Sequence, residues 1–237
     1  MSTELSFNQE TNKNIISKEM IDILSLNFNK CISGYHIIND DPIKEAPWED
    51  INVIILNTSG LRVTSQSNGS HKSGGDLTCF LGCFSNKSTQ YTKENLFKIS
   101  SYRLTSICSE KTPGNINNII DEINNRKNFT FYSIIVRKDT KKQILYDWYL
   151  IPSNLPALNP SSYKWFPKIG KKGLMTGWET DTINGSKMSI IFSMSSQLWI
   201  KLNITDEIKK YLISSCLVNR GKKYNYIELY DKYNSKI

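Results

Sequence analysis

The stretch that most constrains this chain reads GGDLTCFLGCFSNK and covers residues 74–87. Two short runs of apolar or β-favouring residues flank Leu81-Gly82, which suits a two-residue turn. The pattern predicts a tight β-hairpin in which position 80 pairs with 83, 78 with 85 and 76 with 87. Because side chains alternate along a strand, four polar groups are expected on one face: Asp76, Thr78, Ser85 and Lys87.

These polar groups suit the hydrolysis of a phosphodiester. Asp76 can hold Mg²⁺, which prefers oxygen ligands and keeps several of its waters. Bound Mg²⁺ lowers the pKa of water and neutralises phosphoryl oxygens. Lys87 can orient that water or stabilise developing negative charge, whereas Ser85 supplies only a neutral oxygen. A solvated surface pair of Asp76 with Lys87, without a catalytic role, is the competing interpretation.

The charge balance of the whole chain favours an anionic partner. Its 237 residues carry 30 Lys and Arg against 22 Asp and Glu, which gives a net charge of +8. Nucleic acid is the commonest partner of a basic protein, although an ordinary basic protein has the same composition. Hydrophobic residues make up 39% of the chain, enough for a sizeable core, and the length suits one domain.

Cysteine and histidine usage argues against a metal centre built from these residues. The five cysteines contain no CxxC pair and there are only two histidines, so we expect neither a zinc site nor a disulfide framework. The polar start MSTELSFNQE shows no signal peptide, and no apolar run reaches the length of a membrane span. A cytoplasmic protein without membrane association is therefore expected.

Hydrophobic spacing and turn residues predict the remaining secondary structure. The expected helices cover 15–33, 48–56 (or a buried strand there), 115–127 and a last segment that has Thr205 as its N-cap. The expected strands beyond the first hairpin cover 97–104, which is either a strand or the entry to a helix, a hairpin of 129–136 with 144–151, and 188–202. Polar or irregular segments are expected at 57–75, 88–93, 152–167 and 173–189.

One family resemblance is carried by the first hairpin. Asp76, eight further residues and then Ser-x-Lys resemble the nuclease pattern Asp-(x)n-(Asp/Glu/Ser)-x-Lys of the PD-(D/E)XK superfamily. Within it, the chain is similar to type II restriction endonucleases that have a neutral residue at the second acidic position. Five segments carry this resemblance, which spans roughly residues 57–203: 68–76, 85–89, 99–108, the 129–151 hairpin and 185–188.

The resemblance implies an α/β (α+β) fold with a central mixed β-sheet flanked by helices, a restriction-endonuclease-like core. It implies a single nuclease domain over residues 1–237, with its core at 57–203. Residues 1–56 are then an N-terminal helical part, and 204–237 a C-terminal helix and tail. The implied activity is Mg²⁺-dependent cleavage of both strands of double-stranded DNA at a short specific site.

The resemblance also assigns roles to individual residues. Asp76 becomes a metal ligand, Lys87 the water-orienting or charge-stabilising group, and Ser85 the variant second position. An upstream helix in the family often adds a further acid, and Glu49 is the best candidate for this second metal ligand and catalytic residue. A solvated carboxylate at the start of a helix is the alternative interpretation of Glu49.

Sequence readout requires side chains that reach base edges, whereas contacts to phosphates fix the register. Two segments are predicted to approach the DNA: the residues that follow the catalytic strand, and the Gly-containing hairpin tip at Ser186 and Lys187. The basic run at Lys171 and Lys172 is predicted to bind phosphates. The loop before Asp76 is predicted to contribute Lys72. The alternative for these segments is an ordinary surface loop. The predicted DNA-binding residues are Lys72, Ser88, Thr89, Gln90, Lys93, Lys171, Lys172, Ser186 and Lys187.

Three functions remain open at this point. The first is a restriction endonuclease, for which symmetric cutting favours a homodimer and a cognate DNA methyltransferase is the expected genetic partner. The second is a DNA repair or recombination nuclease that reads DNA structure. The third is a non-catalytic DNA-binding protein in which the hairpin residues form only a surface pair.

Overall fold

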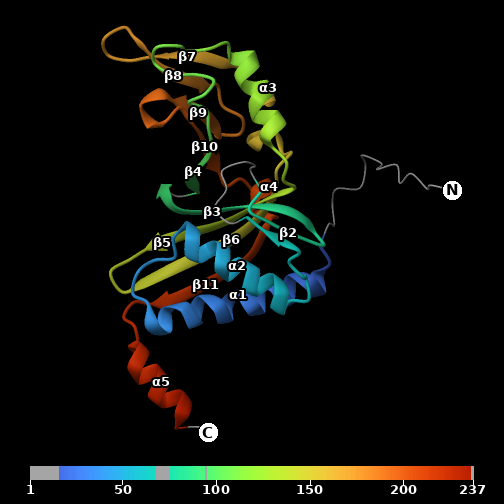
Figure 1. Ribbon diagram of the computed structural model, residues 1–237, viewed down its shortest axis with the longest axis vertical. Coiled ribbons are helices and arrows are strands. Elements are labelled where there is room, and N and C mark those ends of the chain that lie inside the picture. The colour runs from blue at the N-terminus through green and yellow to red at the C-terminus, as the bar shows by residue number, and fades with distance from the viewer. Residues whose placement is uncertain (1–15, 68–74, 94, 236–237) are drawn as a thin grey trace, which may run out of the picture.

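The computed structural model describes residues 16–67, 75–93 and 95–235 (Figure 1). Helices and strands alternate irregularly along the chain. In chain order the elements of the described residues are α1 (Lys18–Ile38), α2 (Glu45–Thr58), β1 (Ser65–Gln66), β2 (Leu77–Cys79), β3 (Gly82–Lys93), β4 (Leu96–Arg103), α3 (Ile116–Arg126), β5 (Phe131–Asp139), β6 (Gln143–Pro152), the 3-10 helices η1 (Pro156–Leu158) and η2 (Pro160–Ser162), β7 (Trp165–Ile169), β8 (Met175–Thr180), β9 (Lys187–Ile191), η3 (Phe192–Met194), β10 (Gln197–Asn203), α4 (Asp206–Lys209), β11 (Leu212–Asn219) and α5 (Tyr226–Asn234).

Eleven strands of the described residues form one mixed sheet. Its order is β11-β6-β5-β3-β4-β10-β9-β8-β7, with β2 paired to β3 and β1 paired to β2. β3 and β5 run parallel and are connected through β4 and α3, whereas the other strand pairs are antiparallel. The fold is a mixed α/β structure with a large mixed sheet flanked by helices, which confirms the predicted fold class at this coarser level.

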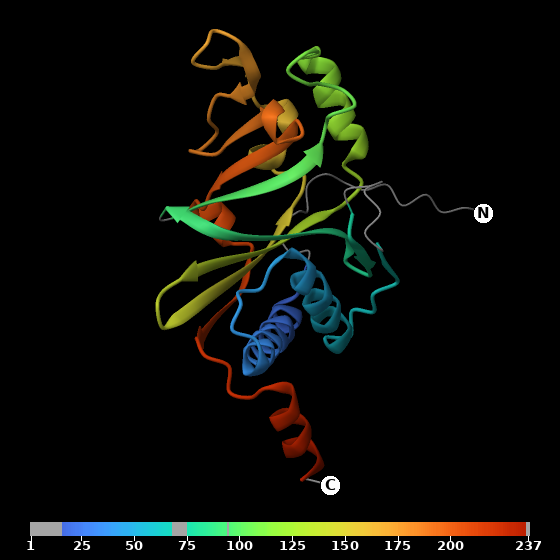
Figure 2. The same ribbon diagram turned by 60° about the vertical axis from the view of Figure 1, so that its left-hand side comes forward.

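Each face of the sheet carries its own hydrophobic core. On one face α1 and α2 pack against β3, β5, β6 and β11, where Phe28 stacks on Trp148 with ring centroids 5.5 Å apart. On the other face α3 contributes Ile119 and Ile123 to a second core. α1 and α2 cover only the lower strands in Figures 1 and 2, so no helix of the described residues covers the same face of β4, β10 and β9.

The two ends of the described chain differ in how they pack. α1 is tied to the sheet by buried Leu24, Phe28 and Ile32. α5 projects away from the rest of the molecule, and none of its residues is buried (Figure 2). No helix that the described residues form is long and apolar enough to cross a membrane.

The first predicted hairpin forms, but its predicted register is wrong by two residues. Cys79 pairs with Gly82 and Thr78 with Cys83, so the turn is Phe80-Leu81. Gly82 begins β3 with φ +131°, and a Cβ there would lie 2.6 Å from the Oγ1 of Thr130, so close packing requires glycine at this strand position. Strand side chains repeat every two residues, so a shift of two residues leaves each side chain on the face that was predicted for it.

The region between 152 and 202 contains more strand than predicted. β7 and β8 form a hairpin inside segments expected to be irregular. Asn184 and Gly185, with φ of 51° and 79°, make the turn from β8 to β9, and this Asn-Gly pair is a hairpin signal. The predicted strand over 188–202 is two strands, β9 and β10, because η3 and the left-handed residues Ser195 and Ser196 reverse the chain between them.

The C-terminal part is also different from the prediction. Thr205 does cap a helix, α4, but this helix has only four residues. The chain then forms β11, which pairs antiparallel with β6 at the end of the sheet, and only afterwards α5. A helix and tail over 204–237 is therefore wrong, because β11 supplies an edge strand and buries Ile213, Cys216 and Val218.

Candidate active site on strand β3

The hairpin of β2 and β3 brings Asp76 close to the Ser85-Asn86-Lys87 segment. Asp76 immediately precedes β2, and its backbone N–H donates to the Phe84 carbonyl at 2.7 Å. Its side-chain Oδ2 accepts a hydrogen bond of 2.5 Å from the Asn86 backbone N–H. The Asp76 carboxylate is therefore held beside β3, next to the segment whose side chains are Ser85 and Lys87.

The sheet divides at this position. One edge of β3 pairs with β5 from Phe84 to Gln90. The other edge pairs first with β2, up to Phe84, and then with β4 from Tyr91 onward. Among the described residues no strand pairs with this edge between those points, and the Asn86 N–H there meets the Asp76 carboxylate. The candidate site thus lies at an opening in the sheet.

Helix α2 adds two carboxylates at this opening. Glu45 Oε1 accepts from the Lys87 Nζ at 2.8 Å, and the Lys87 side chain is only 15% exposed. Glu49 follows one turn later, so both acids project from the same side of the helix. The helix prediction for this segment is confirmed, and Glu49 lies close enough to Asp76 for the two charges to repel each other.

Burial acts on both carboxyl groups in the same direction. Burial away from water raises the pKa of Asp76 above its ordinary value, and the nearby Lys87 ammonium opposes this effect. Burial is also the main reason that the pKa of Glu49 is raised, and the second cause is the charge of Asp76. Two desolvated acids that repel each other favour a bound cation at this place.

The donor set fits Mg²⁺. No group of three or more His, Cys, Asp and Glu side chains in the described part of the chain is close enough together to hold a metal ion. Mg²⁺ keeps several waters and is usually held by one or two carboxylates together with substrate phosphates. Asp76 and Glu49 are two desolvated carboxylates near enough to repel each other, so their chemistry fits this ion.

Ser85 has a supporting position. It is 3% exposed, and its side chain hydrogen-bonds to Asp76, which lowers the pKa of that carboxyl. The hydroxyl therefore orients Asp76 and adds no charge to the site.

A buried polar cluster fixes α2 against the site. Asn52 Nδ2 donates to Asn86 Oδ1 at 2.6 Å and to Ser133 Oγ at 3.0 Å. Trp48 Nε1 donates to the Ser133 carbonyl, and Trp148 Nε1 to its hydroxyl. Since Asn86 stands between Ser85 and Lys87, this cluster sets the distance between the helix acids and β3.

We expect Asn52→Ala to lower the free energy of unfolding by about 1–3 kcal/mol, because it leaves the buried Asn86 Oδ1 without its partner and removes one of the two hydrogen bonds of the Ser133 hydroxyl. Urea unfolding of the purified variant measures this loss. Asn118→Ala, on the exposed side of α3, is the matched control and should stay within about 0.5 kcal/mol of the wild type. Equal losses in both variants would contradict an anchoring role for Asn52.

The raised carboxyl pKa values give a pH dependence in the metal-free protein. A group with a raised folded-state pKa stabilises the fold below its unfolded pKa, and this contribution is lost as the pH rises through the folded value. We therefore expect Asp76→Asn combined with Glu49→Gln to melt at a higher temperature than the wild type at pH 7 in EDTA. The difference should shrink as the pH falls to about 4, near the ordinary carboxyl pKa values. A variant that melts lower than the wild type at pH 7 would contradict the assignment.

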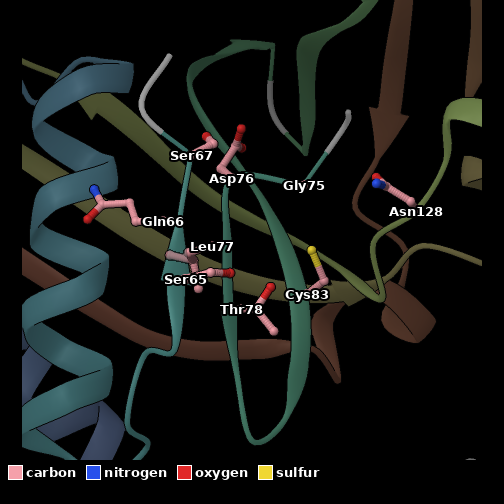
Figure 3. A pocket seen from close by; sticks show the side chains of 9 residues that line it. All are labelled: Ser65, Gln66, Ser67, Gly75, Asp76, Leu77, Thr78, Cys83 and Asn128. Atoms are coloured by element: carbon pink, nitrogen blue, oxygen red, sulfur yellow. The ribbon is translucent and has the colours of Figure 1, made fainter. Parts of the chain in front are cut away.

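A hollow of about 370 Å³ adjoins Asp76 (Figure 3). Residues of β1, β2 and the start of β3 line it, and Asn128 closes its far side. Neither Glu49 nor Lys87 lines this hollow.

The residues predicted to follow the catalytic strand as a loop are part of β3 itself. Ser88 donates to the Ile43 carbonyl and Thr89 to the Lys98 carbonyl, so both hydroxyls have partners within the protein. Gln90 Oε1 accepts from Arg137, and Lys93 ends the strand exposed. The loop prediction for 88–93 is wrong because these residues pair with β5 and then β4.

The second predicted DNA-binding region is a short turn. Ser186 is 1% exposed and its Oγ accepts from the Asn203 backbone N–H, so the predicted exposed tip at this residue is corrected. Lys187 is exposed at the start of β9. Lys171 and Lys172 are exposed in the turn between β7 and β8, and Lys72 lies outside the described residues.

Sequence reasoning missed Glu45 and the anchoring pair Asn52 and Asn86. The spacing of Glu45 and Glu49, four residues apart at a helix start, is the signal that could have placed both acids on one side. No local pattern identifies Asn52, because its partners lie 34 and 81 residues further along the chain.

Comparisons with protein-family models, with curated proteins and with solved structures found no match. Function is therefore argued from the geometry of the site.

Proposed function

We propose that this protein is a Mg²⁺-dependent endonuclease that cleaves double-stranded DNA, of the type II restriction class. The observation that supports it most is the convergence of Asp76, Glu49 and Lys87 at one opening in the sheet. Two acids and a lysine with these neighbours are the groups that phosphodiester hydrolysis with Mg²⁺ requires.

Each residue of the site has a distinct role in this proposal. Asp76 and Glu49 would hold Mg²⁺, which when bound supplies an acidified water and neutralises charge on the scissile phosphate. The Asn86 N–H and the Ser85 hydroxyl orient the Asp76 carboxylate. Lys87 donates to the oxygen on which negative charge develops.

The ion pair of Lys87 with Glu45 is compatible with this role. Glu45 is 48% exposed, and an ion pair open to solvent contributes only about 0–1 kcal/mol. A phosphate oxygen that enters the site can therefore replace Glu45 as the partner of Lys87 at little cost. Glu45 keeps the ammonium beside Asp76 in the absence of DNA.

The same ion pair supports one other candidate function. If Lys87 serves only to neutralise Glu45, the protein is a DNA-binding protein without nuclease activity. DNA is the proposed partner in both cases. A homodimer and a cognate DNA methyltransferase are proposed only for the restriction endonuclease.

Plasmid digestion with Mg²⁺, followed by run-off sequencing of the ends, tests the proposal. A restriction endonuclease gives discrete fragments with one short sequence at every end. Cleavage confined to forks or flaps would instead indicate a repair nuclease. Absence of cutting by the wild type, or equal cutting by an Asp76→Asn preparation made in parallel, would contradict a nuclease site at β3.

A further inference from the structure

Strands β4, β10 and β9 carry three lysines in one cross-strand row, on the face of the sheet that α2 covers only at β3. Lys98 on β4 pairs directly with Lys201 on β10, and Lys201 pairs directly with Lys187 on β9. We call these three residues the lysine row. Neighbouring strands lie about 4.8 Å apart, so the row extends roughly 10 Å across the sheet.

The lysine row is costly in the isolated protein. Like charges directly opposite one another on neighbouring strands destabilise a sheet. Within the described residues none of the three lysines takes part in an ion pair. The Lys98 Nζ instead lies 4.0 Å from the centre of the Trp199 ring, which holds its charge in place on the surface.

The row lies on the open face of the sheet. The residues that alternate with it, among them Ile99, Ile200 and Met188, are buried in the core on the opposite side. On β3, Tyr91 packs against that same core. Asn86, five residues earlier, therefore points to the opposite side, where it meets Asn52 of α2. The lysine row lies on this side of the sheet too. α2 stops over β3 and leaves this face of β4, β10 and β9 without a covering helix among the described residues (Figures 1 and 2).

The row also begins next to the candidate active site. The Thr89 hydroxyl donates to the Lys98 carbonyl at 2.6 Å, and Thr89 is two residues after Lys87 on β3. A ligand lying along Lys187, Lys201 and Lys98 therefore reaches β3 next to the opening in the sheet, on the side of β3 that carries Asn86 and opposite to Ser85.

We propose that the lysine row binds the phosphate backbone of a DNA duplex that extends to β3 beside the opening in the sheet. A duplex carries one negative charge per about 1.7 Å of its axis, so a basic row of this length faces several phosphates at once. This inference rests on the proposed function for the direction of the duplex, but the binding itself is measurable without cleavage. It assigns a phosphate contact to Lys187, which the sequence predicted only as DNA-binding.

The test compares wild type with the triple variant Lys98→Gln, Lys187→Gln and Lys201→Gln, by fluorescence anisotropy on labelled 30-base-pair duplexes in EDTA. Each phosphate contact contributes about 0.9 to the slope of log K against log salt, so the slope should fall by about 2 to 3. Binding at 0.15 M salt should weaken at least about tenfold, and by the same factor for every duplex sequence. The triple Lys→Arg variant should bind like the wild type because it keeps the charges.

A charge-matched control removes three exposed lysines elsewhere, Lys30, Lys141 and Lys222, each changed to Gln. It should keep the wild-type slope almost unchanged. Equal losses in the control would show that only net charge matters, and an unchanged slope in the row variant would show that DNA binds elsewhere. Wild-type binding to phosphatidylglycerol vesicles as tight as to duplex would also overturn the assignment to DNA.

The outcomes separate this inference from the nuclease proposal. If the wild type cuts no plasmid and the row variant loses DNA binding, the lysine row is supported and the nuclease proposal is rejected. Full plasmid cutting and an unchanged salt slope in the row variant reject the lysine row and leave the nuclease in place.

Discussion

Asp76→Asn will abolish Mg²⁺-dependent DNA cleavage, with an expected loss of about a thousandfold or more. The substitution removes a charged ligand for the ion, and the several kcal/mol that a metal contributes to the transition state correspond to about tenfold for each 1.4 kcal/mol. Binding of duplex should be nearly unchanged, because the phosphate contacts are made by other residues. The measurements are the single-turnover cleavage rate and anisotropy binding on the same DNA.

Asp50→Asn is the matched control. Asp50 lies next to Glu49 on α2 but is exposed, so its loss removes the same charge without removing a ligand. We expect near wild-type cleavage from this variant. Cleavage by Asp76→Asn at the wild-type rate, or an equal loss in Asp50→Asn, would remove Asp76 from the active site.

Lys87→Ala will reduce the cleavage rate by about 10²–10³-fold, the loss typical when one donor to a developing negative charge is removed. Ser85→Ala should cost less than tenfold, because the Asn86 backbone N–H continues to hold the Asp76 carboxylate. The comparison is made under single-turnover conditions at saturating enzyme, which separates the chemical step from DNA binding.

Glu45→Gln distinguishes the two roles open to Lys87. If Lys87 acts on the phosphate, removing its partner leaves the lysine available and cleavage largely intact. If Lys87 only neutralises Glu45, the wild type should cut no DNA, and any loss of stability in Lys87→Ala should be reversed when Glu45→Gln restores neutrality. Equal effects of Lys87→Ala and Ser85→Ala on the rate would contradict the division of roles proposed for them.

Local patterns in the sequence determined the elements that carry the site. The spacing of Asp76, Ser85 and Lys87 placed them on one face of a hairpin, and an error of two residues in the register left that face unchanged because strand side chains repeat every two residues. The apolar spacing of 115–127 predicted α3 in the same way, since Ile119 and Ile123 recur one helical turn apart.

Tertiary structure alone decided what surrounds that hairpin. Glu49 is held near enough to Asp76 to be repelled by it because Asn52 ties α2 to β3 and β5, and these hydrogen bonds join residues 34 and 81 positions apart. The lysine row exists because β4, β10 and β9 pair in one particular register, which places Lys98 opposite a residue about a hundred positions away. Sequence periodicity reports which side of its own strand a residue occupies. Strand order and register depend on which distant surfaces bury each other, and this is why the helix acids and the lysine row became visible only in the folded protein.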